Sequence, residues 1–116
     1  MVDTPLDITG GLPYNRRVRV VGAAITWPTL DDFEVRSEIR VSADHTSKLK
    51  GTLTQYITPS IDGDDIVLDL NFSGSATRVL PSGHYDIIIS DKGSADARAI
   101  RPLKGRLQVT PSVTGA

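Results

Sequence analysis

The sequence predicts a single all-β domain, and three features of its composition and patterning lead to this fold class. Twelve of the fourteen acidic residues are aspartate, which suits turns, and only two are glutamate, which suits helix interiors. Valine, isoleucine and threonine, which favour strands, total 31 residues, whereas alanine, leucine and glutamate total 20. Apolar and polar side chains alternate with a period of two in several segments. A length of 116 residues is enough for one domain with one hydrophobic core.

Residues 1–15 are expected to form an extended N-terminal arm that precedes the domain at residues 16–110. Two prolines in the arm remove backbone donors, and the pair Gly10 and Gly11 adds flexibility, so no strand is specified there. We therefore expect the arm, together with the C-terminal tail at residues 111–116, to contact other chains and to stay outside the core of its own domain.

The first strand is expected within residues 16–27, either as one strand or as a bent pair with Gly22 at a bulge. The clearest strand follows at residues 33–42, where apolar or small side chains fall on one face and mostly charged side chains on the other. A helix would scatter those apolar positions around its whole circumference. The charged face mixes acidic and basic residues, which fits either a solvated face or a polar contact with another protein.

The remaining strands are expected at residues 52–57, 66–72, 84–90, 96–101 and 103–110. Between them we expect a turn at residues 58–65 and a short helical turn across one end of the fold at residues 73–83. About seven strands joined by turn residues are typical of an immunoglobulin-like β-sandwich, which is the predicted architecture. The side chains expected to point into its core are Phe33, Val35, Ile39, Val41, Ile66, Leu68, Leu70, Phe72, Tyr85, Ile87, Ile89, Leu103, Leu107 and Val109.

The residue types that carry chemistry are few in this chain. There is no cysteine, so thiolate metal sites and thiol nucleophiles are excluded. The two histidines, His45 and His84, are too few for a histidine metal site, and no serine lies in a strand–turn–helix elbow. The aspartates at residues 62–65 lack the spacing of a calcium loop and are expected to form a turn. We therefore expect no catalytic residue, no metal and no cofactor.

Charge and hydropathy also limit the classes of partner. The formal net charge is −1, so no basic excess exists to bind a nucleic-acid backbone. No apolar run approaches the length of a membrane helix, and the N-terminal residues lack the basic and apolar regions of a secretion signal. We expect neither nucleic acid nor a membrane as a partner.

Eight residues are candidates for binding a protein partner. Some are the irregularly spaced apolar residues of the arm, and three are arginines in the only local basic cluster, for which a solvated face is the simpler interpretation. The single tryptophan is expected either in the core or, because Pro28 ends the strand beside it, at an interface. The candidates are Leu6, Ile8, Leu12, Tyr14, Arg16, Arg17, Arg19 and Trp27.

The order of these features resembles small β-sandwich virion proteins of tailed bacteriophages, which include the fibre-collar family and the N-terminal domain of baseplate upper proteins. Residues 80–86 match a stretch of that group that reads leucine, proline or alanine, small, glycine, any residue, tyrosine, aspartate. Residues 105–109 match its closing strand, which reads glycine, any residue, leucine or isoleucine, any residue, valine. The resemblance covers about residues 18–113, and its motifs are structural.

The resemblance implies a non-enzymatic structural protein of the virion, present in several symmetric copies or as a homo-oligomer and bound to other virion subunits. A minor tail or collar protein is the first expectation, and a capsid decoration protein is the alternative. A carbohydrate-binding sandwich is a further alternative, which would need exposed aromatic side chains. The chain has six aromatic residues, of which Phe33, Phe72 and Tyr85 are already expected in the core.

Overall fold

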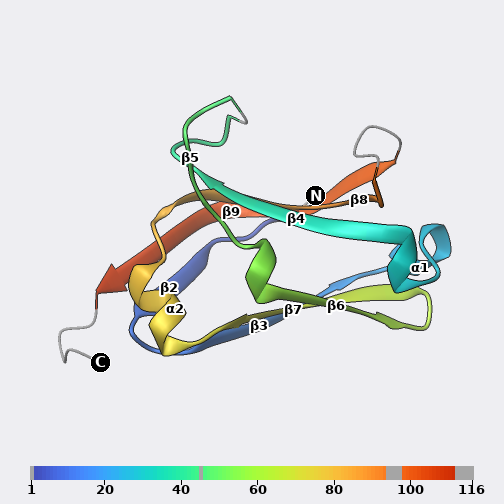
Figure 1. The fold of residues 1–116 in the computed structure, drawn as a ribbon, viewed down its shortest axis with the longest axis horizontal. Helices are drawn as coiled ribbons and strands as arrows, with labels where there is room; N and C mark the ends of the chain where they lie inside the picture. Colours follow the sequence, from blue (N-terminus) through green and yellow to red (C-terminus); the bar gives the residue numbers. More distant parts are fainter. Residues whose placement is uncertain (1, 45, 94–97, 112–116) are drawn as a thin grey trace.

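The computed structural model describes residues 2–44, 46–93 and 98–111, whose strands form two sheets packed face to face (Figure 1). Two short helices, α1 and α2, lie at opposite ends of this sandwich. In chain order the elements are β1 (Val2–Asp3), β2 (Leu6–Gly10), β3 (Tyr14–Val20), α1 (Ala23–Thr26), η1 (Leu30–Asp32), β4 (Phe33–Arg40), β5 (Leu49–Thr52), η2 (Thr54–Tyr56), β6 (Ile57–Asp62), β7 (Asp65–Phe72), α2 (Gly74–Val79), β8 (Gly83–Asp91) and β9 (Ala99–Pro111).

The strand order identifies the type of sandwich. The larger sheet has the order β1–β9–β8–β4–β5, with β2 also paired to β9, and the smaller sheet has the order β3–β7–β6. In immunoglobulin terms β4, β8 and β9 are the C, F and G strands, β5 is the added C′ strand, and β3, β7 and β6 are the B, E and D strands. The predicted all-β sandwich is therefore confirmed, and its strand order matches the immunoglobulin-like arrangement.

The core lies between the two sheets and is built from alternate side chains of each strand. Eleven of the fourteen side chains predicted to point inward are buried, and Val35 and Val109 are half-buried against the same core. The prediction is wrong for Val41, which is 55% exposed. Strand β4 ends at Arg40, so Val41 leaves the sheet and its backbone N–H donates to the carbonyl of Lys48 in the β4–β5 hairpin.

The N-terminal residues do not form an arm outside the core, and that prediction is wrong. Strand β2 lies parallel to β9, with Leu6 opposite Leu107 and Gly10 opposite Pro111. The side chains of Leu6 and Ile8 are fully buried, at 0% and 2% exposure. Pro5 falls between β1 and β2, where its missing N–H interrupts neither strand.

Other segments differ from the prediction in smaller ways. Residues 58–65 include strand β6 as well as a turn, and Pro59 is tolerated because β6 is an edge strand. The strand expected at residues 52–57 is replaced by the end of β5 and the short helix η2. Gly22, with φ of 76°, is the N-cap residue before helix α1 and forms no bulge.

The C-terminal half follows the prediction more closely. The helical turn expected at residues 73–83 is confirmed as α2, where the hydroxyl of Ser73 accepts from the backbone N–H of Ala76 at 3.1 Å. The two strands expected after residue 96 are one strand, β9, from Ala99 onward. Of the predicted tail at residues 111–116, only Pro111 lies within the described residues.

Strand β8 begins at a glycine that allows close packing, and this gives a first testable prediction. A Cβ atom on Gly83 would lie 2.6 Å from the carbonyl oxygen of Arg40 and 2.9 Å from Cγ2 of Ile39. We expect Gly83→Ala to lower the free energy of unfolding by about 1–3 kcal/mol, because backbone or core must shift. Urea unfolding followed by circular dichroism measures the change.

Gly51 is the matched control for this substitution, since it lies on strand β5 of the same sheet, on the other side of β4. A Cβ atom there would meet Pro81 Cγ at 3.6 Å, which is an ordinary contact. Gly51→Ala should leave stability unchanged or raise it slightly. Equal unfolding midpoints for the two variants would contradict the close approach at Gly83.

Candidate protein-binding surfaces

The structure separates the eight residues that the sequence singled out for partner binding. Leu6 and Ile8 are in the core, and Leu12 is 45% exposed in the β2–β3 connection. Tyr14 is half-buried, with its ring centroid 6.0 Å from that of Phe72. Apolar residues of the N-terminal segment therefore mostly pack within the domain.

Trp27 occupies the core, which is the first of the two positions considered for it. Its exposure is 2%, and its ring packs against Phe33 with the centroids 6.2 Å apart. The indole N–H donates to the carboxylate of Asp91 at 2.7 Å, and the guanidinium of Arg98 lies 6.0 Å from the indole centroid. The residue thus joins the β3–β4 connection to the end of β8.

The three arginines do not form one basic cluster, because successive residues of a strand point to opposite faces. Arg17 and Arg19 lie on the outer face of the smaller sheet and pair with aspartates of β6 and β7. The Arg17–Asp69 distance is 2.7 Å, and Arg19 pairs with Asp62 at 2.7 Å and Asp65 at 2.9 Å. Arg16 faces the opposite side at the edge of the sheet, and inward charge on an edge strand opposes unwanted strand pairing.

Two carboxylates in these networks make stability depend on pH. The pKa of Asp65 is lowered by the backbone N–H of Gly22 and by Arg19, and the pKa of Asp91 is lowered by Arg98 and by Trp27. A carboxylate whose pKa is lower in the folded state than in the unfolded state stabilises the folded state at pH values above its unfolded pKa, which is near 3.8. This contribution is lost as the pH falls through the folded pKa.

We therefore expect the free energy of unfolding to fall as the pH drops below about 4. In the Asp65→Asn, Asp91→Asn double variant the same fall should be shallower, because two titratable carboxyl groups are removed. The number of protons taken up on unfolding should then be lower by up to about two. Urea titrations between pH 2 and pH 7 provide the measurement. A double variant whose pH dependence equals that of the unchanged chain would contradict this assignment.

The outer face of the larger sheet carries a second set of charges, which strand pairing brings together. Arg40 lies opposite His84, and His84 lies opposite Arg106, so three neighbouring strands place three nitrogen-bearing side chains in one row. The next row along the strands consists of Glu38, Asp86 and Lys104. We call Arg40, His84, Lys104 and Arg106 the basic surface.

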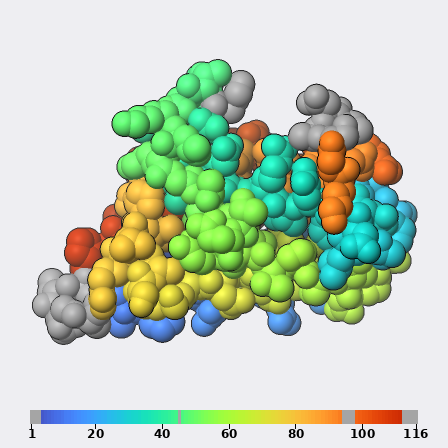
Figure 2. Space-filling view, viewed as in Figure 1, coloured from blue at the N-terminus to red at the C-terminus, as the bar shows by residue number. Residues whose placement is uncertain are grey.

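The basic surface lines a hollow of about 380 Å³, bounded on one side by the β4–β5 hairpin through Ser42 and Asp44. In the space-filling view this hairpin projects from the body of the molecule (Figure 2). The hollow is large enough for a few side chains of another molecule or for a small ligand.

The hollow is lined by four arginine or lysine side chains and three carboxylates, and not every basic side chain is paired among the described residues. Arg40 pairs with Glu38 at 3.1 Å and donates to the carbonyl of Ser47 at 2.7 Å. Asp86 pairs with Arg101 at 3.6 Å. Within the described part of the chain, Lys104 and Arg106 have no carboxylate partner. The face therefore offers positive charge to a ligand or partner.

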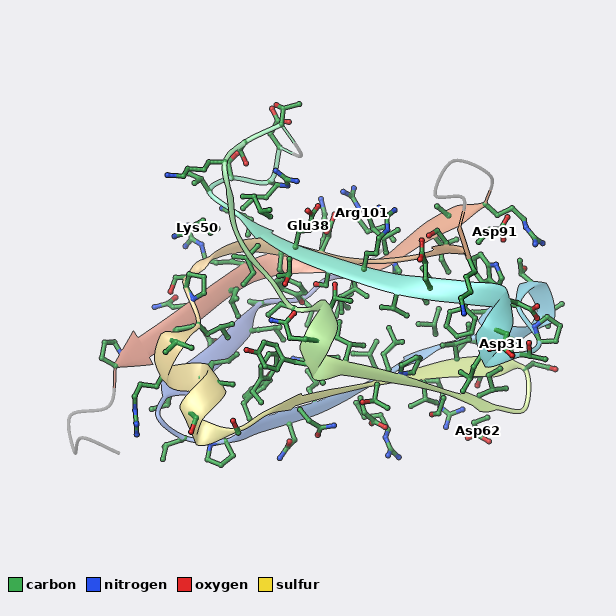
Figure 3. All side chains as sticks on the ribbon, in the orientation of Figure 1. Asp31, Glu38, Lys50, Asp62, Asp91 and Arg101 are labelled. Carbon is green, nitrogen blue, oxygen red and sulfur yellow. The ribbon has the colours of Figure 1, made fainter. Side chains whose placement is uncertain are left out.

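The opposite end of the sandwich is acidic. Asp31 and Asp32 lie on η1, directly before β4, and Asp62 and Asp64 lie at the two-residue β6–β7 turn, where Gly63 has φ of 63°. Asp31 and Asp62 are labelled at this end in Figure 3, away from Lys50. All four aspartates are exposed. We call Asp31, Asp32, Asp62 and Asp64 the acidic end.

Only some of these carboxylates have partners. Asp62 pairs with Arg19, and the carboxylate of Asp32 accepts from the backbone N–H of Thr29 at 3.0 Å. Asp31 and Asp64 form no ion pair with any other described residue. The sequence showed each of these charges, but not their grouping, because the register that joins residues from distant segments is not visible in the local pattern.

No group of three or more histidine, aspartate or glutamate residues in the described ranges is placed to hold a metal ion. Among these ranges no helix is both long and apolar enough to cross a membrane. No family model matches the chain, and comparison with curated proteins gave no match.

Proposed function

We propose that the chain is a non-enzymatic structural subunit of a tailed-phage virion, a minor tail or collar protein that binds neighbouring subunits. The observation that carries this proposal is that residues 80–86, which match the motif of that group of virion proteins, have structural roles in this fold. Leu80 is buried, Gly83 packs against β4, and the hydroxyl of Tyr85 donates to the carbonyl of Thr4 at 2.5 Å. These residues build the fold, as the motifs of that group of virion proteins do.

The surfaces of the sandwich support a role in binding protein. Both sheets present outer faces with paired charges, and the basic surface and the acidic end add some charges that are not paired with any described residue. Apolar side chains are exposed at the ends, with Val21 at 81% and Ile25 at 69% near α1, and Val79 at 77% on α2. Mixed polar and apolar surfaces of this kind are typical of protein–protein contacts.

Two other roles rank lower. Capsid decoration would use the same fold and surfaces and differs only in the place of the subunit on the particle. A carbohydrate-binding module would present aromatic rings for stacking, but Trp27, Phe33, Phe72 and Tyr85 are buried. Tyr14 and Tyr56 are half-buried beside Phe72, so all six aromatic side chains serve packing.

The test is whether the chain is part of purified particles. Cells that carry the gene for this chain are induced, tailed particles are purified on a density gradient, and the chain is sought by peptide mass spectrometry and by gold-labelled antibody. We expect the chain in the particle fraction with label on the tail. Label on the head would favour capsid decoration, and intact particles that lack the chain would overturn the proposal.

A further inference from the structure

The charges that have no ion-pair partner among residues 2–44, 46–93 and 98–111 are separated along the strands. Strand β4 begins directly after Asp32 of the acidic end and finishes at Arg40 of the basic surface. At about 3.3 Å per residue, its eight residues separate the two surfaces by roughly 25 Å. Strand β8 runs between the same two regions in the opposite direction, from Gly83 to Asp91.

We propose that the acidic end of one copy docks against the basic surface of a second copy, so that copies of this chain join head to tail. The inference deepens the proposed function and rests on it for the place of such an assembly in a virion. The contact itself is a property of the purified chain.

Charge complementarity favours a second copy as the occupant. The net charge is −1, and strand pairing places basic side chains on one region and aspartates on another, so each molecule carries both partners of the contact. Lys104 and Arg106 supply donors that lack a carboxylate within the described residues, and Asp31 and Asp64 supply carboxylates that lack a cation there. Charge-assisted hydrogen bonds between such groups are about twice as strong as neutral ones.

The shapes of the two surfaces also fit this contact. The β6–β7 turn is a two-residue hairpin, so Asp64 lies at the tip of a narrow projection. The hollow beside Lys104 and Arg106 has a volume of about 380 Å³, which accommodates a few side chains. The two shorter dimensions of the molecule are 31 and 22 Å. The cross-section of its end is therefore on the order of the surface area that each partner buries in a small specific protein–protein interface.

The symmetry of the assembly follows from the use of two different surfaces. A contact between unlike surfaces is heterologous, and repeating it generates a closed ring or an open filament. A pair of copies related by a two-fold axis is not the expected product, because that arrangement would bring the same surface of each copy together.

Charge reversal tests the contact by sedimentation velocity at about 50 mM salt, where exposed charges are weakly screened. We expect the unchanged chain to form species larger than a monomer, and to return to monomer at about 1 M salt. Lys104→Glu with Arg106→Glu, and separately Asp31→Lys with Asp64→Lys, should each weaken self-association at least about tenfold. The matched control, Arg36→Glu with Arg78→Glu, makes the same change of net charge at two exposed positions outside both surfaces and should still associate.

Mixing the two reversed variants provides the decisive measurement. Each reversed surface then meets its complement on the other variant, so the mixture should associate although neither variant does so alone. The same rescue is expected when all four substitutions are placed in one chain. Rescue also shows that the variants are folded, because a misfolded chain could not complement its partner.

Three results would overturn the inference. One is a monomer at low salt and high protein concentration, and another is association of a reversed variant as strong as that of the unchanged chain. The third is binding of polyglutamate or heparin to Lys104 and Arg106 by a chain that stays monomeric, which would assign the surface to another class of acidic partner. A monomeric chain found in particles would refute this inference alone, whereas a self-associating chain absent from particles would refute only the proposed function.

Discussion

Removing residues 1–10 is expected to leave a chain without a cooperative unfolding transition. The deletion removes β1 and β2, opens the edge of β9, and takes the fully buried side chains of Leu6 and Ile8 out of the core. It also removes the carbonyl of Thr4 that accepts from the hydroxyl of Tyr85. Loss of a buried leucine or isoleucine side chain costs about 2–5 kcal/mol, and a small domain has only about 5–15 kcal/mol in total.

Point substitutions distinguish the loss of buried side chains from a general effect of shortening the chain. Leu6→Ala and Ile8→Ala should each lower the free energy of unfolding by about 2–5 kcal/mol in urea titrations. Asp7→Ala and Thr9→Ala, at exposed positions of the same strand, should change it by less than about 0.5 kcal/mol. A deletion variant that unfolds cooperatively at the urea concentration of the full chain would show that this segment is dispensable for folding.

This segment also shows why part of the fold escapes local analysis. Strands β4 and β7 were predictable because each has one face against the core, so their apolar side chains recur with a period of two. The same alternation is present at Leu6 and Ile8, but over five residues and next to prolines and glycines. What places β2 in the sheet is its pairing with Leu107, about one hundred residues later in the chain, and local sequence does not specify such a partner.

The candidate surfaces also depend on pairing between strands that are distant in the sequence. Arg40, His84 and Arg106 lie on three strands, and their row exists only because β8 pairs with β4 and β9 in a particular register. Conversely, Arg16 and Arg17 are adjacent in sequence, yet they lie on opposite faces of β3. Clustering in sequence was therefore a poor guide to clustering on the surface of this all-β chain.

The period-two pattern also did not predict that an apolar side chain on the outer face of a sheet is buried. Val67 lies on the outer face of β7 and yet is 4% exposed. It lies opposite Arg19 of β3 and Ser60 of β6, so β7 is flanked on both sides. The long aliphatic part of an arginine can cover apolar surface while its charged end stays in solvent. Burial at Val67 thus depends on neighbours that only the sheet order supplies.

Trp27 is the other position where we expect a large effect, because it closes one end of the core. Its ring contacts Phe33 at the start of β4, and its indole N–H reaches Asp91 at the end of β8. The connection from β3 through α1 to β4 is thereby held against the larger sheet. Exposed neighbours in the same connection, such as Ile25 at 69% exposure, make no comparable contact with the core.

Trp27→Ala is expected to lower the free energy of unfolding by about 3–5 kcal/mol, enough to unfold much of the protein at moderate urea concentrations. Trp27→Phe should cost less than Trp27→Ala, because it keeps an aromatic ring against Phe33 while losing the donor to Asp91 and part of the buried volume. Ile25→Ala is the control and should change stability by less than about 0.5 kcal/mol. Circular dichroism is the suitable readout, since the substitution removes the only tryptophan. If Trp27→Ala instead left the unfolding midpoint unchanged and weakened binding to a partner subunit, Trp27 would be an interface residue and its place in the core would be wrong.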